Sequence, residues 1–183
     1  MVGWIVLGII VLVALWAVAI FNKLVKNRNL VLEGWSGIDV QLKRRYNLIP
    51  NLVETVKGYA GHEKEALEKV VELRNSAAQA QTASEKAPIE NMLTQTLSQL
   101  FALAEAYPDL KANQNFLELQ EQLSEIEEQI QLSRRYYNGT ARDMNILVQS
   151  FPSNLIASSF GFNKADYFEI ELATERETPK VEF

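Results

Sequence analysis

The sequence predicts an all-α fold in which an N-terminal transmembrane helix continues into an antiparallel bundle of two long and two short helices, followed by an extended C-terminal tail. Three observations predict it. Residues 2–21 contain no charged side chain and are long enough to cross a hydrocarbon core of about 30 Å. An apolar stripe at helical spacing continues directly beyond them. Proline and glycine then divide the rest of the chain into helix-sized segments.

The first segment, residues 1–21, is predicted to be a membrane anchor. Val2 and Phe21 bound the apolar run, and Trp4 and Trp16 fit an interface or lipid packing. The run lacks a basic residue before it and a small-x-small cleavage site after it, which argues against a cleavable signal peptide. Cations close behind the run favour a short N-terminus outside and a cytoplasmic helical domain. These cations are Lys23, Lys26 and Arg28.

The first helix is expected to continue from residue 22 into the soluble part of the chain. Pro50 removes a backbone donor, but the apolar phase is the same on both sides of it, so it predicts a kink and not a break. Gly58 and Gly61 mark the end of the helix. The stripe comprises Val31, Trp35, Ile38, Leu42, Ile49, Leu52, Val56 and Tyr59.

Two short helices are expected next. The second helix is predicted over residues 62–80, with acidic side chains in its first turn. Residues 81–87 are small and polar and are expected to form a loop. The third helix is predicted over residues 88–106, because proline suits a first turn and Tyr107 before Pro108 ends the segment.

The fourth helix is the second long one. Asn113 is its expected N-cap, and the apolar phase continues through Asn138-Gly139 as far as Phe151, where Pro152 ends the helix. Residues 153–183 form the predicted tail, so the domains are an anchor at 1–21, a helical bundle at 22–152 and this tail. Apolar side chains alternate in the tail with a two-residue period, which fits short strands and fits equally an extended segment packed on helices.

The composition excludes several classes of function. The chain has no cysteine and a single histidine, His62, so it offers neither a disulfide framework nor a thiolate metal site. Residues 22–61 have a net charge of +4, whereas residues 62–183 have −9, so most of the domain is too acidic for nucleic acid. We expect no catalytic residue, no metal and no cofactor.

Arg45 is unusual because it occupies an apolar position of the first helix. A charge there must be paired or lie near solvent. If the two long helices run antiparallel, residue 45 lies opposite about residue 128, which predicts a buried ion pair with Glu127 or Glu128. An anion site at Arg45 is the functional alternative.

The unequal helix lengths predict an uncovered surface. Four helices pack in the half far from the membrane, but only the two long helices reach the membrane-proximal half, where they cannot bury their stripes alone. The tail, a membrane partner or another copy must cover them. The candidate oligomer contacts are Val31, Trp35, Met144, Val148, Phe168, Ile170, Leu172, Val181 and Phe183.

Several stretches resemble one known family. They include WSGIDVQLKRRYNLIPNLVETVKGYAGHE at 35–63, YPDLKANQNFLELQ at 107–120, RRYYN at 134–138, FPSNLIA at 151–157 and PKVEF at 179–183. Over nearly its whole length the chain resembles the LemA family of bacterial membrane proteins, although Met144-Asn145 stands where the family has a second Tyr-Asn pair. The resemblance implies an N-terminal anchor in a bacterial inner or plasma membrane and a four-helix domain. It carries over no catalytic residue.

We therefore expect a non-enzymatic, membrane-anchored scaffold that self-assembles laterally into a homo-oligomer and organises or remodels the membrane. The alternative is an envelope adaptor or sensor that binds another membrane protein, such as a protease or signalling receptor. The expected partners are a second copy and the lipid bilayer, with another envelope membrane protein in the alternative reading. An enzyme needs a pocket of convergent titratable groups, which the sequence does not supply.

Overall fold

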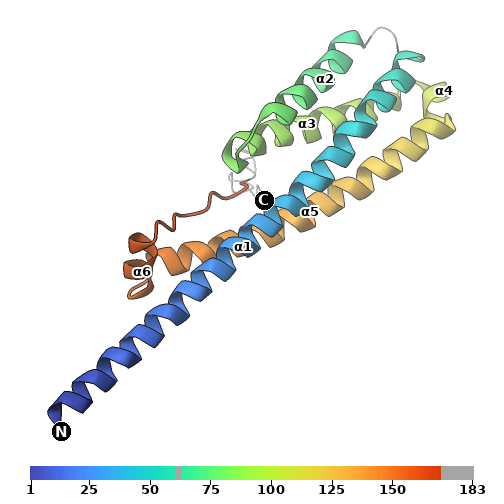
Figure 1. Ribbon diagram of the computed structural model, residues 1–183. Coiled ribbons are helices and arrows are strands. Elements are labelled where there is room, and N and C mark those ends of the chain that lie inside the picture. The colour runs from blue at the N-terminus through green and yellow to red at the C-terminus, as the bar shows by residue number, and fades with distance from the viewer. Residues whose placement is uncertain (61–62, 170–183) are drawn as a thin grey trace, which may run out of the picture. The chain divides into compact units, whose positions relative to one another are not determined.

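The computed structural model describes residues 1–60 and 63–169. These fall into two compact units, of which the first comprises residues 1–38 and 133–167 and the second comprises residues 39–60, 63–132 and 168–169. The described part of the chain is helical and contains no strand, which confirms the all-α class. Within the described residues the helices are α1 Val2–Lys57, α2 Lys64–Gln79, α3 Ala83–Ala104, α4 Pro108–Lys111, α5 Gln114–Gln149 and α6 Ser153–Ser159 (Figure 1).

Helix α1 is continuous over 56 residues, from the apolar N-terminal run to Lys57. Pro50 lies inside it and does not end it. Within the described residues, α1 is the helix long and apolar enough to cross a membrane, with a mean hydropathy of 2.9 in its most apolar window and none of that window buried. Further along α1, the side chains of the predicted apolar stripe face the core, and Ile38, Leu42 and Ile49 are fully buried.

Helix α3 begins five residues earlier than the sequence pattern predicted. Thr82 caps it, because the Thr82 hydroxyl accepts from the Glu85 N–H at 3.3 Å. The Glu85 carboxylate in turn accepts from the backbone N–H groups of Gln81 and Thr82, which lowers its pKa. The predicted loop at 81–87 is therefore wrong: a capping box starts a helix there despite the small polar composition, and Pro88 lies inside that helix.

Helix α5 begins where the sequence predicted, because the Asn113 side chain accepts from the Phe116 N–H at 3.0 Å and caps it. It continues through Gly139 and ends at Gln149. The expectation of an extended tail from residue 153 is wrong for its first part, which forms α6. One face of α6 is buried through Ser153 and Ala157, and this packing stabilises a helix too short to persist alone.

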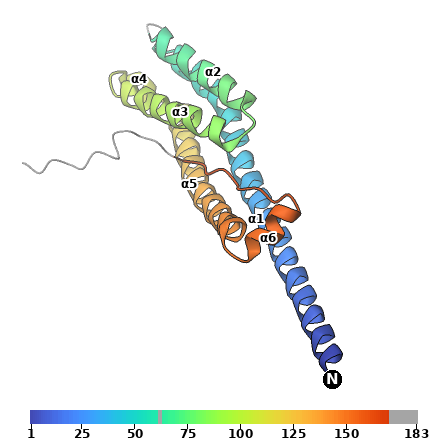
Figure 2. The same cartoon turned by 90° about the vertical axis from the view of Figure 1, so that its left-hand side faces the viewer.

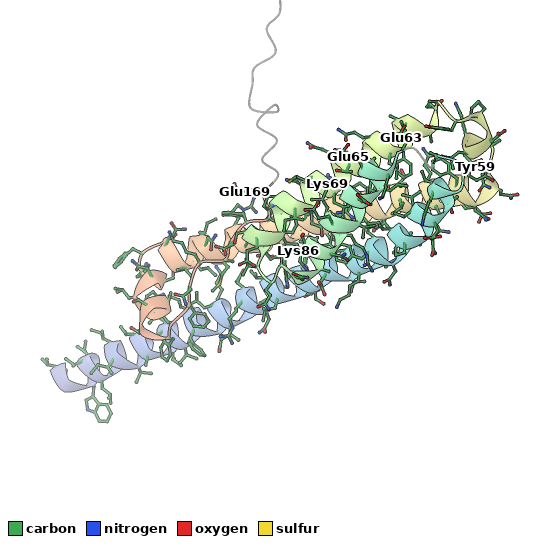
Figure 3. All side chains as sticks on the ribbon, turned by 90° about the horizontal axis from the view of Figure 1, so that it is seen from above. Tyr59, Glu63, Glu65, Lys69, Lys86 and Glu169 are labelled. Atoms are coloured by element: carbon green, nitrogen blue, oxygen red, sulfur yellow. The ribbon has the colours of Figure 1, made fainter. Side chains whose placement is uncertain are left out.

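The core of the second unit is built mainly from α1, α2, α3 and α5, and Leu110 of α4 adds to it. Leu52 of α1, Val70 of α2, Leu93 of α3 and Ile126 of α5 are all buried. At the end of this unit where α1 stops, the Asn113 amide donates to the Tyr59 hydroxyl at 3.0 Å. The Tyr107 hydroxyl donates to Glu63 at 3.2 Å, and Figure 3 labels Tyr59 and Glu63 at this end.

The first unit has its own small core, built from Leu24, Met144, Ala157 and Phe162. Helices α1 and α5 approach closely at Gly34, where an added Cβ would lie 3.1 Å from the Tyr137 Cα. Beside it the Trp35 and Tyr137 rings are 5.7 Å apart. Figure 2 shows α6 next to α1 in this unit.

The segment after α6 is fixed to α5 by side chains of that helix. The Asn145 amide donates to the Ala165 carbonyl at 2.9 Å and accepts from the Ala165 N–H at 2.8 Å. The Tyr137 hydroxyl donates to the Asp166 carbonyl at 2.8 Å. Residues 153–167 therefore cover part of the apolar stripe that the two long helices leave open. Of the three candidates named from the sequence, namely the tail, a membrane partner and another copy, the tail covers this part.

Candidate functional site

The most unusual polar group of the second unit is a buried cluster around Arg45, whose side chain is 1% exposed. We define the Arg45 cluster as Arg45 and Tyr46 from α1, Glu90 and Thr94 from α3, and Glu127 from α5. Each residue projects from a helix face that otherwise contributes apolar side chains to the core. The cluster therefore joins three helices through one guanidinium.

The guanidinium has several partners. Arg45 Nη1 donates to Thr94 Oγ1 at 2.9 Å and to Glu127 Oε2 at 2.6 Å, and Nη2 pairs with Glu90 Oε2. The other oxygen of Glu90 accepts from the Tyr46 hydroxyl. Thr94 also donates to Glu127 at 3.3 Å. These bonds offset the large cost of removing the charges of Arg45 and Glu90 from water, whereas Glu127 stays 27% exposed.

Burial acts on Tyr46 most strongly. It raises the pKa of the Tyr46 hydroxyl well above its usual value near 10, and the neighbouring Glu90 carboxylate raises it further. The phenol therefore stays protonated and acts as a donor to Glu90. Such a group holds a neighbour in place, and it is a poor proton acceptor at neutral pH.

A second ion pair lies close to the start of α3. Lys86 Nζ is 3.4 Å from Asp39 Oδ1, and Lys43 Nζ is 2.9 Å from Asp39 Oδ2. The hydrogen bond from Lys43 lowers the pKa of Asp39, with a smaller contribution from Lys86. Figure 3 labels Lys86, which comes from the early part of α3 that the sequence pattern assigned to a loop.

A hollow of about 400 Å³ opens beside the Arg45 cluster. Its walls include Arg45, Thr94 and Glu127 together with the apolar side chains of Leu97 and Leu117. Because carboxylates and a hydroxyl already engage the Arg45 guanidinium, the arrangement does not favour the anion site considered from the sequence. Within the described ranges, no group of three or more His, Asp and Glu side chains is placed to hold a metal ion.

The structure separates the two carboxylates that the sequence offered as partners of Arg45. Glu127 contacts Arg45, whereas Glu128 is exposed on α5. Sequence reasoning missed Glu90, Thr94 and Tyr46. The signal for Glu90 was present, because it falls in the helical series of buried side chains Ala83, Ala87, Glu90, Leu93 and Leu97, but starting the helix at residue 88 concealed that series.

The proposed anchor side chains divide into two groups. Val2 is 75% exposed, Trp4 80% and Trp16 44%, so these side chains are not packed against the rest of the chain. Phe21 is half-buried, with its ring 4.8 Å from that of Phe160. The cations Lys23, Lys26 and Arg28 are exposed, and Arg28 also lies 5.5 Å from the centre of the Phe162 ring.

The candidate oligomer contacts are also divided. Met144 and Phe168 are buried within the chain itself, which removes them as surface contacts in this fold. Val31, Trp35 and Val148 are half-buried in the first unit. The remaining candidates, Ile170, Leu172, Val181 and Phe183, lie outside the described residues.

These features define an all-helical protein with an apolar N-terminal helix long enough to cross a membrane and a largely helical remainder. The sequence pattern of the LemA family matches residues 34–183, and the chain belongs to that family. The match begins within α1, beyond the apolar run, and covers the rest of α1 and all of α5.

Individual relatives are more distant. The chain is 25% identical over 163 residues to the protein named LemA from Metamycoplasma hominis, covering 88% of this chain and 72% of the relative. It is also 25% identical over 163 residues to magnetosome protein MamQ 2 of Paramagnetospirillum magneticum, covering 73% of this chain and 59% of that protein. Magnetosome protein MamQ of Magnetospirillum gryphiswaldense is 22% identical over 159 residues, with 73% and 58% covered. The chain therefore spans less than two thirds of each of these magnetosome proteins.

Proposed function

We propose that this chain is a non-enzymatic, membrane-anchored scaffold whose copies associate side by side and so organise or remodel the membrane. In this proposal residues 2–21 cross a bacterial inner or plasma membrane. The helical domain is cytoplasmic, and α1, α2, α3 and α5 form an antiparallel four-helix bundle. One observation carries the proposal: α1 is a single helix that holds both the apolar run and the first element of the domain.

Self-association is supported by apolar side chains that α6 leaves open. In the first unit, Leu32 of α1 is 59% exposed, and Tyr136 and Ile146 of α5 are 48% and 52% exposed. Large apolar side chains left open on two neighbouring helices favour contact with another apolar surface. Relatives named as magnetosome proteins favour a role at a membrane.

Cysteine crosslinking in membranes tests the scaffold. The natural chain has no cysteine, so Leu32→Cys and Tyr136→Cys introduce single reactive positions. We expect both variants to give crosslinked dimers, because the proposed contact brings copies together along α1 and α5. Glu72→Cys, exposed on α2 in the second unit, is the matched control and should give few. Only monomers from all three variants would refute lateral association.

A groove in the second unit favours the alternative, an adaptor that binds another envelope protein. It measures about 500 Å³, and Val53, Leu67 and Val71 provide its apolar walls, with Lys57 and Glu68 among its charged residues. The mass of the detergent-extracted particle separates the two functions. A large homogeneous assembly of this chain alone supports the scaffold, whereas a small one-to-one complex with another protein supports the adaptor.

A further inference from the structure

The surface around α6 carries large apolar side chains that the chain itself does not cover. Phe151 is 79% exposed, Phe160 62% and Leu155 56%. We call these three residues the α6 foot. Helix α6 is docked on the core through Ser153 and Ala157, which leaves Leu155 exposed. Phe151 and Phe160 flank α6, and the Phe160 ring contacts that of Phe21 while most of its surface stays exposed.

The sequence around the foot is also free of charge. Residues 144–163 hold no Asp, Glu, Lys or Arg and are flanked by Asp143 and Lys164. Charged residues make up 22% of the chain, so a run of this length would ordinarily contain about four of them. The exposed side chains of this stretch are therefore apolar or uncharged, so moving them from water into a membrane interface removes no charge from water.

The foot lies at the level where the apolar run of α1 ends. The Phe160 ring lies 4.8 Å from that of Phe21, the last residue of the run. In the first unit α1 and α5 are antiparallel, with Trp35 beside Tyr137. Phe21 precedes Trp35 by as many residues as Phe151 follows Tyr137, so the C-terminal end of α5, two residues before Phe151, comes near the level of Phe21.

Membrane depth follows from this level. If residues 2–21 fill a hydrocarbon core of about 30 Å, Phe21 and the foot both lie at its boundary with the headgroups. Exposed cations follow both apolar segments in the sequence: Lys23, Lys26 and Arg28 follow the apolar run of α1, and Lys164 follows α6. Apolar side chains beside exposed lysine and arginine are the pattern of a helix that lies in a membrane interface.

We propose that the α6 foot inserts into the headgroup region of the leaflet in which the α1 span ends. The domain then contacts the bilayer through two elements, the span and α6. This inference depends on the anchoring part of the proposed function and is independent of self-association. We favour lipid over a second copy as the occupant, because the foot continues the lipid-facing surface of the span and cations follow both segments in the sequence.

Site-specific quenching tests the insertion. Single cysteines at Phe151→Cys, Leu155→Cys and Phe160→Cys are labelled with an environment-sensitive fluorophore. The full-length chain is then placed in vesicles of phosphatidylcholine and phosphatidylglycerol. We expect phospholipids brominated near the headgroup to quench these labels several-fold more than a label at Arg135→Cys. Arg135 is exposed on α5, and the 14 residues from it to the end of that helix place it about 20 Å from the end where α6 follows.

Leu12→Cys, near the middle of the apolar run, reports on the anchor independently and is tested with phospholipids brominated deep in their acyl chains. If lipid quenches the Leu12→Cys label but aqueous iodide alone quenches the foot labels, the insertion is refuted and the anchor stands. Protection of the foot that rises with the protein-to-lipid ratio refutes insertion in favour of a second copy. No lipid quenching at Leu12→Cys refutes the anchor itself, and the inference with it.

Discussion

Arg45 is held by carboxylates from two other helices, and this pairing determines what its replacement does. We expect Arg45→Met to lower the free energy of unfolding by about 3–5 kcal/mol, because it leaves the buried Glu90 carboxylate without its cation. Glu90→Met should cost less, because Arg45 keeps its ion pair with Glu127. The double variant should lose less than the sum, because both charges are then gone. Chemical denaturation of the detergent-solubilised chain, followed by circular dichroism, measures these losses.

Glu128→Gln is the matched control for this cycle. Glu128 is exposed on the same helix as Glu127, so its replacement should change the free energy of unfolding by less than about 0.5 kcal/mol. If Arg45→Leu were as stable as the natural chain and assembled in the same way, the Arg45 cluster would have no role in specifying the fold.

Tyr46 gives the second unit a predictable response to alkali. Its pKa is raised in the folded state by burial and by Glu90, so the folded form keeps its proton after the unfolded form has lost it. The corresponding stability is fully present below pH 10 and decreases as the pH rises above that value, because the unfolded state then binds fewer protons. We expect Tyr46→Phe to be less stable at neutral pH but to lose less stability between about pH 9 and pH 11.

Unfolding curves recorded across this pH range measure the slope for each protein. Tyr136→Phe is the control, because Tyr136 is an exposed tyrosine and its removal should leave the slope unchanged. Equal slopes for Tyr46→Phe and the natural chain would show that Tyr46 ionises alike in the folded and unfolded states.

At the scale of elements, two glycines of α1 make a matched pair. Gly37 has no heavy atom within 4 Å of an added Cβ, so Gly37→Ala should raise the free energy of unfolding by about 1 kcal/mol through helix propensity alone. Gly34→Ala makes the same propensity gain but places its methyl group 3.1 Å from the Tyr137 backbone. We therefore expect Gly34→Ala to be the less stable of the two variants.

Thermal and chemical unfolding of both variants measure this difference directly. Because the propensity term is common to both, the difference isolates the contact between α1 and α5. An equal increase in the free energy of unfolding for Gly34→Ala and Gly37→Ala would mean that α1 and α5 can move apart at Gly34 without a loss of stability.

The long helices could be predicted from sequence because their signal is local and repeated. The stripe of α1 keeps its phase on both sides of Pro50, and that of α5 keeps it through Gly139, so neither residue outweighs the pattern. The start of α3 was missed because composition was given more weight than the capping box at Thr82 and Glu85. Helix α6 was missed because packing on α1 and α5 stabilises it, and its own residues do not.

The candidate site could be predicted only in part, for a related reason. A single charge in an apolar stripe marked Arg45, and the antiparallel register placed Glu127 and Glu128 within reach of it. Register alone does not say which of two neighbouring carboxylates faces inward. Glu90 lies on α3, which is connected to α1 through α2. No local sequence pattern in α1 predicts that Glu90 is the partner of Arg45.

For the whole molecule, the scaffold depends on α1 being unbroken between the apolar run and the second unit. Asn29 is exposed in this stretch, and Asn29→Pro removes a helical hydrogen bond and costs about 3 kcal/mol of helix stability. We expect the detergent-extracted particle of this variant to fall in mass, because copies would no longer present α1 and α5 in one fixed arrangement.

Asn29→Ala is the control and should keep the mass of the natural particle. Both variants should remain in the membrane fraction, because residues 2–21 are unchanged. An unchanged mass for Asn29→Pro would show that assembly does not require a continuous first helix.

Helix α6 packs against one side of α1, so the first unit has exposed apolar side chains on the α6 side of α1 and none from α6 on the other side. A bilayer thinner than the hydrophobic length of a helix makes that helix tilt. A lone helix with the same surface all round has no preferred direction of tilt. With apolar side chains on one flank, leaning toward that flank sinks them deeper, and leaning away lifts them into water. A change in local bilayer thickness would therefore tilt the helix in a defined direction. That direction, measured relative to α6, would be the same in every copy.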